Sequence, residues 1–238
     1  MTLVVGFLGA MMADSLSCSL SSPIGHRPTQ ASEDHIKIIP APNLTPVFHD
    51  PDTGEDHTPD MIGVAGSTRA IEMFKLDPTD MLGLFGLDHF EPGYWEVGFM
   101  NYQFSDSASL SVIMRVGEKF FKVTFDGRSL EITKLRNYFV IGSGTPVFES
   151  IKTMVFNDDK VSPNELSVLI KLIIAGEEED SVGGLFRYCP QGSTSVFASK
   201  PSITEEDRQS ILKSYRRSLY QRAGHELPQE KEEGESLK

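Results

Sequence analysis

The sequence predicts an α+β protein in which two stacked antiparallel sheets are flanked by helices, a four-layer αββα sandwich. Two observations carry this prediction. Strand-forming segments occur in clusters, and helical segments separate the clusters instead of following each strand. Segments such as MIGVAG (61–66) and YFVIGS (138–143) are apolar at successive positions, which is typical of strands covered on both faces. A doubly wound parallel sheet would need a helix after each strand, so it is disfavoured.

The first element follows from the apolar run MTLVVGFLGAMMADSLSCS. No Lys or Arg precedes Arg27, so the run lacks the basic start of a secretory signal. Glycines and Asp14 interrupt it too early for a membrane span. We therefore expect two strands, 2–8 and 11–18, joined by a tight turn at 9–10.

The remaining elements follow from periodicity and from the residues that favour turns. The segment 41–60 holds four prolines and five acidic residues, so we expect a surface loop without a regular element there. Strands are predicted at 34–40, 61–66, 94–104, 109–116, 119–125, 129–135, 137–143, 185–189 and 193–199. Helices are predicted at 67–77, 145–157, 162–176 and 203–222. Ser162 is the expected cap of the third helix, because Pro163 suits a first helical position.

Composition restricts the class of protein. The chain has 238 residues, a net charge of −12 and two cysteines. We expect one domain over 1–222 and a disordered acidic tail over 223–238. The negative charge disfavours nucleic-acid binding, and two cysteines exclude a disulfide framework and a four-thiolate zinc site. We also expect no membrane segment and a cytoplasmic location.

Six short motifs occur in an order and spacing that point to one family. They are TLVVG (2–6), MAD (12–14), HIKI (35–38), IGVAG (62–66), IGSG (141–144) and DSVGG (180–184). No single motif is specific, and the joint order and spacing of the six is what indicates the family. On these motifs the chain resembles, over about residues 2–200, the proteasome β-subunits within the N-terminal nucleophile (Ntn) hydrolases.

The resemblance implies a threonine-type peptidase or amide hydrolase that needs no cofactor and acts in an oligomer on a peptide or amide substrate. Thr2 would be the nucleophile once Met1 is removed. A threonine hydroxyl is a weak nucleophile that needs a base, and a free α-amino group with a pKa of about 7.7–8.0 can serve. Lys37 would stabilise the alkoxide, and Asp14 would hold Lys37 in place.

The resemblance also implies three supporting residues. The backbone N–H of Gly63 would point at the developing oxyanion. Ser143 and Asp180 would bind the terminal amine and Thr2 and so orient the base.

Each of these residues has a plainer interpretation in the local sequence. Thr2 could be a β-branched residue of a strand, and Asp14 could belong to a turn or a cap. Lys37 could lie on the solvent face of an edge strand. Ser143 could belong to a strand-to-helix turn in which Ser143 or Thr145 is the cap, and Asp180 could lie at a solvated helix end.

Departures from the family keep a second function open. The first hairpin is short, the excursion 41–60 lengthens the interval between Lys37 and Gly63, and 77–93 is rich in Gly and Pro where relatives have a long helix. The alternative is a non-catalytic proteasome-like subunit with a structural or binding role. His49 and His57 lie among acidic residues but lack close ligand spacing, so no metal site is expected.

Overall fold

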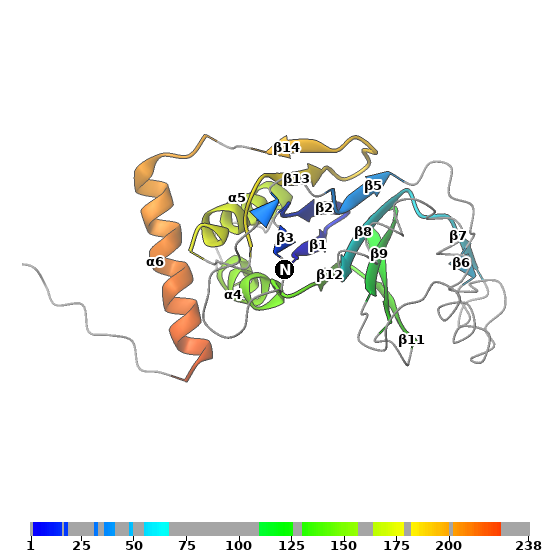
Figure 1. The fold of residues 1–238 in the computed structure, drawn as a ribbon, viewed down its shortest axis with the longest axis horizontal. Helices are drawn as coiled ribbons and strands as arrows, with labels where there is room; N and C mark the ends of the chain where they lie inside the picture. The colour runs from blue at the N-terminus through cyan, green and yellow to red at the C-terminus, as the bar shows by residue number, and fades with distance from the viewer. Residues whose placement is uncertain are drawn as a thin grey trace, which may run out of the picture.

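Two five-stranded antiparallel sheets form the centre of the molecule in this computed structural model (Figure 1). The structure describes residues 2–15, 17–18, 31–32, 36–40, 48–49, 55–66, 110–125, 130–156, 164–178, 182–199 and 202–224. The first sheet has the order β12 (Tyr138–Ile141), β1 (Val4–Phe7), β2 (Ala10–Ala13), β13 (Phe186–Cys189) and β14 (Phe197–Ser199). The second has the order β11 (Leu130–Arg136), β10 (Lys119–Phe125), β9 (Leu110–Val116), β8 (Met61–Gly66) and β5 (Ile38–Pro40).

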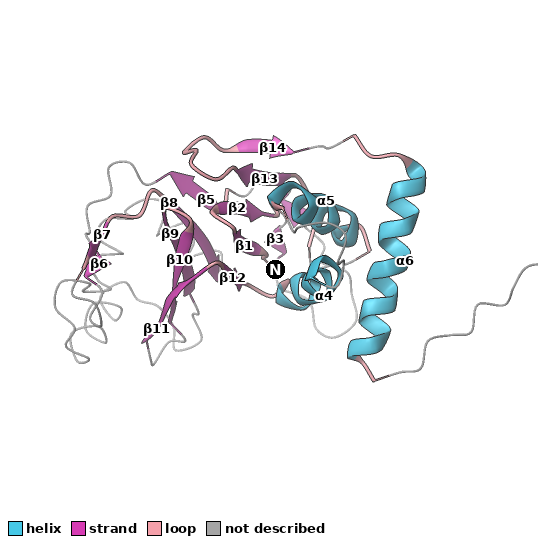
Figure 2. Cartoon of the chain, turned by 180° about the vertical axis from the view of Figure 1, so that it is seen from behind, coloured by secondary structure: helices cyan, strands magenta, loops and turns pink. Residues whose placement is uncertain are grey.

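Three helices lie on the outer side of the first sheet: two cover its face, and the third packs on those two. They are α4 (Thr145–Phe156), α5 (Glu165–Gly176) and α6 (Glu205–Arg222). Figure 2 shows α4 and α5 beside the sheet and α6 outside them. Thr204 caps α6, because its hydroxyl accepts a hydrogen bond from the backbone N–H of Asp207 at 3.1 Å.

Alternation along the first hairpin explains why β1 and β2 are buried on both faces. In β1, Val5 and Phe7 pack with the helices, whereas Val4 packs with the second sheet. In β2, Met12 points to the helices and Met11 to the second sheet. A strand with two buried faces is apolar at every position, as this hairpin is.

The predicted α+β class with two antiparallel sheets is confirmed. Strands β8 and β10 have the predicted bounds, and α4 and α5 lie within one to three residues of the predicted helices. The predicted helix at 67–77 and strand at 94–104 lie outside the described residues.

The structure corrects three details of the sequence prediction. The first turn is formed by Leu8 and Gly9, which both have positive φ (49° and 80°), and residue 10 already belongs to β2. The segment 41–60 does contain regular structure, because β6 (Phe48–His49) pairs with β7 (Asp56–His57). Helix α5 is capped by Asn164 rather than Ser162, since the Asn164 side chain accepts from the Ser167 N–H at 2.8 Å.

A second small hairpin joins β3 (Ser17–Cys18) to β4 (Ala31–Ser32). None of the described helices is long and apolar enough to cross a membrane.

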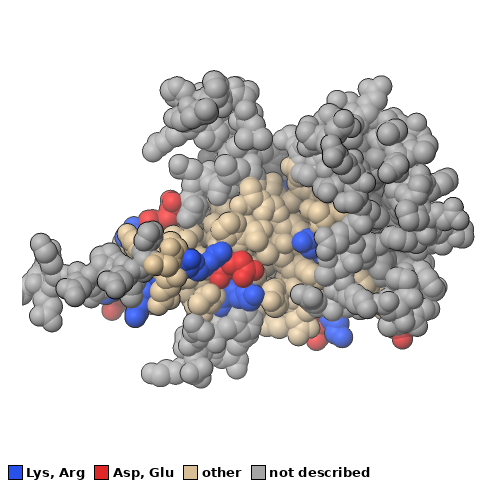
Figure 3. All heavy atoms as spheres, turned by 90° about the horizontal axis from the view of Figure 1, so that it is seen from below, with Lys and Arg blue, Asp and Glu red and all other residues tan. Residues whose placement is uncertain are grey.

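Basic and acidic side chains lie side by side on the described surface (Figure 3). Two ion pairs join α6 to the end of α5: Arg208 donates to Glu177 at 2.9 Å, and Arg216 donates to Glu178 at 2.7 Å. Because both pairs are solvent-exposed, each contributes less than about 1 kcal/mol. The position of α6 therefore depends more on buried Leu212 and Tyr215.

Candidate active site

The carboxylate of Asp14 lies just after β2 and is completely buried. One of its oxygens, Oδ1, accepts from the Lys37 Nζ at 2.6 Å and from the Leu3 backbone N–H at 2.7 Å. The other, Oδ2, accepts from the Gly183 N–H at 3.4 Å. Three segments distant in sequence therefore meet at one carboxylate.

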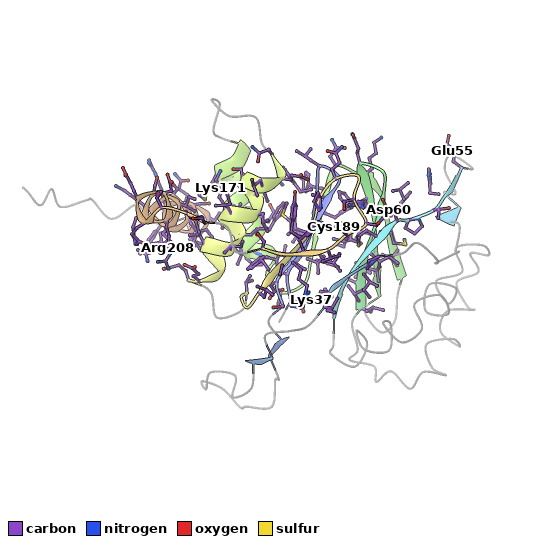
Figure 4. The ribbon with its side chains drawn as sticks, turned by 90° about the horizontal axis from the view of Figure 1, so that it is seen from above. Lys37, Glu55, Asp60, Lys171, Cys189 and Arg208 are labelled. Atoms are coloured by element: carbon purple, nitrogen blue, oxygen red, sulfur yellow. The ribbon has the colours of Figure 1, made fainter. Side chains whose placement is uncertain are left out.

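Lys37 lies just before β5 and is 1% exposed. In Figure 4 it lies among the strands near the middle of the molecule, whereas Arg208 lies at the helical end. Lys37 forms the ion pair with Asp14 that the family resemblance implied. Because Asp14 Oδ1 also binds Leu3 N, the Lys37 ammonium is two hydrogen bonds away from the backbone that follows Thr2.

Burial and the charge of Lys37 act in opposite directions on the pKa of Asp14. Removal from water raises the pKa of this carboxyl, because burial disfavours the charged form. The positive charge of Lys37 and the hydrogen bonds from Leu3 and Gly183 oppose that rise. The geometry favours an ionised carboxylate, since all three groups at its oxygens donate hydrogen bonds.

Thr2 is held at the start of β1 by the turn between β12 and α4. Its backbone N donates to the Ser143 Oγ at 3.1 Å, and its carbonyl accepts from the Gly144 N–H at 3.0 Å. Gly142 has φ +95°, and a Cβ added to it would lie 2.1 Å from the Thr2 carbonyl oxygen. Only glycine therefore permits this approach of the turn to residue 2.

The Thr145 hydroxyl closes this turn, because it donates to the Gly142 carbonyl at 2.7 Å. The Ser143 hydroxyl instead faces the backbone nitrogen of residue 2. A capping hydroxyl would accept from an N–H of the first helical turn, and neither of these two contacts is of that kind.

Four of the six predicted site residues come together: Thr2, Asp14, Lys37 and Ser143. This group contains a hydroxyl next to a backbone nitrogen that a polar side chain orients, and a buried cation held by a carboxylate. If that nitrogen were a free amine, such a set could deprotonate a hydroxyl and stabilise the resulting alkoxide. Their catalytic roles remain predictions, and Asp180 lies outside the described residues.

Gly63 lies in the middle of β8, opposite Ile38 and Ile113. A Cβ added to it would lie 2.5 Å from Val4 Cγ1, so the missing side chain allows the two sheets to approach. Val64 donates its N–H to the Lys37 carbonyl on the β5 side, so the N–H of Gly63 faces β9. Sheet packing explains this glycine, and its oxyanion role remains a prediction.

Arg115 was not predicted from the sequence, although a charge within the apolar strand LSVIMRV is the signal that could have revealed it. Its guanidinium is fully buried and binds both Asp60 oxygens, at 2.8 and 3.0 Å. It also donates to the carbonyls of Gly9 and Pro190, each at 3.0 Å, and to that of Ser193. Arg115 therefore links β9 to two turns of the other sheet.

Cys189 lies beside this arginine, with its Sγ 3.5 Å from Nη1 of Arg115. Figure 4 shows Cys189 and Asp60 at the same end of the strands, away from Arg208. Burial raises the pKa of the Cys189 thiol, and the Arg115 guanidinium opposes that rise. Buried and largely protonated, this thiol is not a candidate nucleophile.

No group of three or more His, Cys, Asp or Glu side chains in the described ranges is placed to hold a metal ion. The four residues Thr2, Asp14, Lys37 and Ser143 provide hydroxyl, amine and carboxylate groups.

Comparison with known proteins gives only distant likenesses. The sequence matches no protein-family model and no curated protein. Similar solved structures include eukaryotic HslV from Trypanosoma brucei, with a TM-score of 0.47 and 14% identity, covering 83% of this chain and 99% of HslV. They also include Anbu from Hyphomicrobium sp. strain MC1, with a TM-score of 0.46 and 13% identity, covering 97% of this chain and 100% of Anbu. A mutant of the same Anbu has a TM-score of 0.46 and 13% identity, and the match covers 94% of this chain and 98% of the mutant. All three scores are below 0.5, so these likenesses carry no argument about the function of this chain.

Proposed function

We propose that this chain is a threonine-type peptidase or amide hydrolase of proteasome-like type, in which Thr2 is the nucleophile after Met1 is removed. One observation supports this most directly. Residue 2 is held at its nitrogen by Ser143, while the next backbone N–H binds the same Asp14 oxygen that holds Lys37. Any buried strand start needs partners for its N–H groups, but here both partners are side chains, and one of them also holds a buried lysine.

In the proposed reaction, the Thr2 Oγ attacks the carbonyl carbon of the substrate amide. The free α-amine of Thr2 takes the hydroxyl proton and later gives it to the leaving amine as the C–N bond breaks. Water then hydrolyses the ester and restores the hydroxyl. Removal of Met1 is required, because an amide nitrogen cannot accept this proton.

The other residues would act on this centre in different ways. Lys37 would stabilise the alkoxide by its charge, and Asp14 would keep that charge in position. Ser143 would orient the amine through the contact now made by the Thr2 backbone nitrogen. Asp180 would be the amine partner. An oxyanion role for Gly63 would require its N–H, which faces β9 here, to turn towards Thr2.

The test is hydrolysis of small peptide-amide reporters by protein whose loss of Met1 is verified by intact mass. We expect Thr2→Ala and Lys37→Ala to abolish turnover. Thr2→Ser should retain some activity, because a hydroxyl and the α-amine both remain. A form that keeps Met1 should be folded and inactive.

Equal rates for wild type and Thr2→Ala would contradict this mechanism. A correctly processed wild type that cleaves no reporter would favour the non-catalytic structural or binding subunit.

We also propose that the protein acts as a homo-oligomer in the cytoplasm. The family resemblance supports the oligomer, and the low cysteine content supports the location. Sedimentation of the purified protein and imaging of a C-terminally tagged form test the two statements.

A further inference from the structure

Arg187, in the middle of β13, has a hydrogen-bonding group without a partner among the residues that the structure describes. Its side chain is half-buried, and its Nε is shielded from solvent without a hydrogen-bond partner in the described ranges. Buried donors are almost always satisfied, because an unmade bond leaves the cost of desolvation uncompensated. By contrast, Arg115 uses its Nε in a bond to Asp60. An unsatisfied buried donor needs an explanation, and a ligand for the guanidinium would provide one.

Strand register places Arg187 on the same face as Thr2. Val4 pairs with Ala13, and Ala13 pairs with Arg187 on the next strand. Val4, Ala13 and Cys189 all pack between the two sheets. Because side chains alternate along a strand, Thr2 shares the face of Val4, and Arg187 shares that of Cys189.

The distance between Thr2 and Arg187 suits a substrate that lies across the strands of the sheet. Two strand spacings and two residues of rise place the Cα atoms of Thr2 and Arg187 about 12 Å apart. An extended peptide advances about 3.3–3.6 Å per residue. A side chain within two or three residues of the bond at Thr2 therefore comes within reach of the guanidinium.

We propose that Arg187 is a specificity-determining residue that binds a carboxylate of the substrate. This inference rests on the proposed function and adds its substrate class, an acidic peptide. A guanidinium presents a planar fork of donors that matches a carboxylate. The net charge of −12 repels acidic substrates from the protein as a whole, so a preference for them requires a local cation.

The experiment compares kcat/KM for reporters that differ only in Glu, Gln or Lys at each of the three residues before the cleaved bond. Each peptide is made with a free and with an amidated C-terminus, which separates a side-chain carboxylate from a terminal one. We expect wild type to prefer one carboxylate-bearing peptide by about tenfold or more, as for a hydrogen bond to a charged group. Arg187→Gln should remove the preference, and Arg187→Lys should keep part of it.

Two controls separate recognition from structure. Arg217→Gln removes an exposed arginine of α6 and should leave the preference unchanged. Arg187→Met should leave the urea midpoint of unfolding unchanged or raise it, because the donor that it removes has no partner among the described residues. A lower midpoint would give Arg187 a structural role and overturn the proposal.

The proposal for Arg187 would also be overturned by a wild type that cleaves the charged and neutral reporters equally, or by a preference that survives Arg187→Gln.

If wild type cleaves nothing, the proposed function fails, and a binding experiment tests Arg187 separately. Fluorescence anisotropy of labelled Glu and Gln peptides with Thr2→Ala protein should then show tighter binding of the Glu peptide, and Arg187→Gln should abolish the difference. Equal binding would overturn the role of Arg187.

Discussion

Lys37 and Asp14 are both almost fully removed from water, so each charge depends on the other. We expect Asp14→Ala to lower the free energy of unfolding by about 3–5 kcal/mol, because it leaves a buried ammonium without its carboxylate. Urea unfolding monitored by circular dichroism measures the loss. Glu149→Ala is the control: its partner Lys152, at 3.4 Å, is partly exposed, so the loss should stay below about 1 kcal/mol. Equal losses would show that the buried pair contributes no more than a surface pair.

A double variant separates stability from catalysis at the same pair. In Asp14→Asn with Lys37→Met, both charges are gone and the amide oxygen can still accept from the Leu3 N–H. Replacing a buried pair with neutral groups is often close to neutral for stability. We therefore expect this variant to unfold closer to wild type than Asp14→Ala does and to remain inactive in the reporter assay.

At the scale of elements, the turn between β12 and α4 controls where Thr2 lies. We expect Gly142→Ala to lower kcat/KM by about a hundredfold, because the added methyl group must displace the Thr2 carbonyl and a shift of about 1 Å can have that effect. Gly117→Ala is the matched control: its φ is +61°, but nothing lies within 4 Å of the added Cβ. It should lose about 1–2 kcal/mol of stability and keep full activity. Activity that survives Gly142→Ala would show that Thr2 need not be held there.

Most elements could be predicted because their signals are local. The helix α4 and the strands β8 and β10 follow from periodicity and from the turns that bound them. The errors arose where local chemistry had two solutions. Leu8 adopts a positive φ that a leucine rarely takes, and Asn164 caps α5 although Ser162 also suited that role. Elements are therefore predictable to within a few residues, but their ends depend on contacts made elsewhere.

At the scale of the whole molecule, residues 2, 14, 37 and 143 could be selected only through the order of six motifs, because none has a specific local signal. Their meeting depends on the antiparallel register of β1 with β2 and β12, which no local pattern encodes. Arg115 and Arg187 were missed for the same reason. A charged residue in a strand is usually on the solvent face, and only the pairing of sheets shows that both arginines point between them.

Arg115 connects the two sheets, so the thiol beside it should report their separation. Cys189 is fully buried and burial raises its pKa, so iodoacetamide can react with it only when the structure opens. We expect Arg115→Lys to raise the labelling rate of Cys189 by at least about tenfold, which is 1.4 kcal/mol of opening free energy. Lysine keeps the charge but cannot bind both Asp60 oxygens and the turn carbonyls together.

Mass spectrometry of the Cys189 peptide follows this reaction separately from that of Cys18. Arg216→Lys, which alters an exposed ion pair of α6, is the control and should leave the rate unchanged. The free energy of unfolding, measured on the same proteins, distinguishes local opening from loss of the whole fold. If Arg115→Lys labels no faster than wild type, the sheets are held together by apolar packing around Phe120 and Met11 alone, and the arginine is not the link between them.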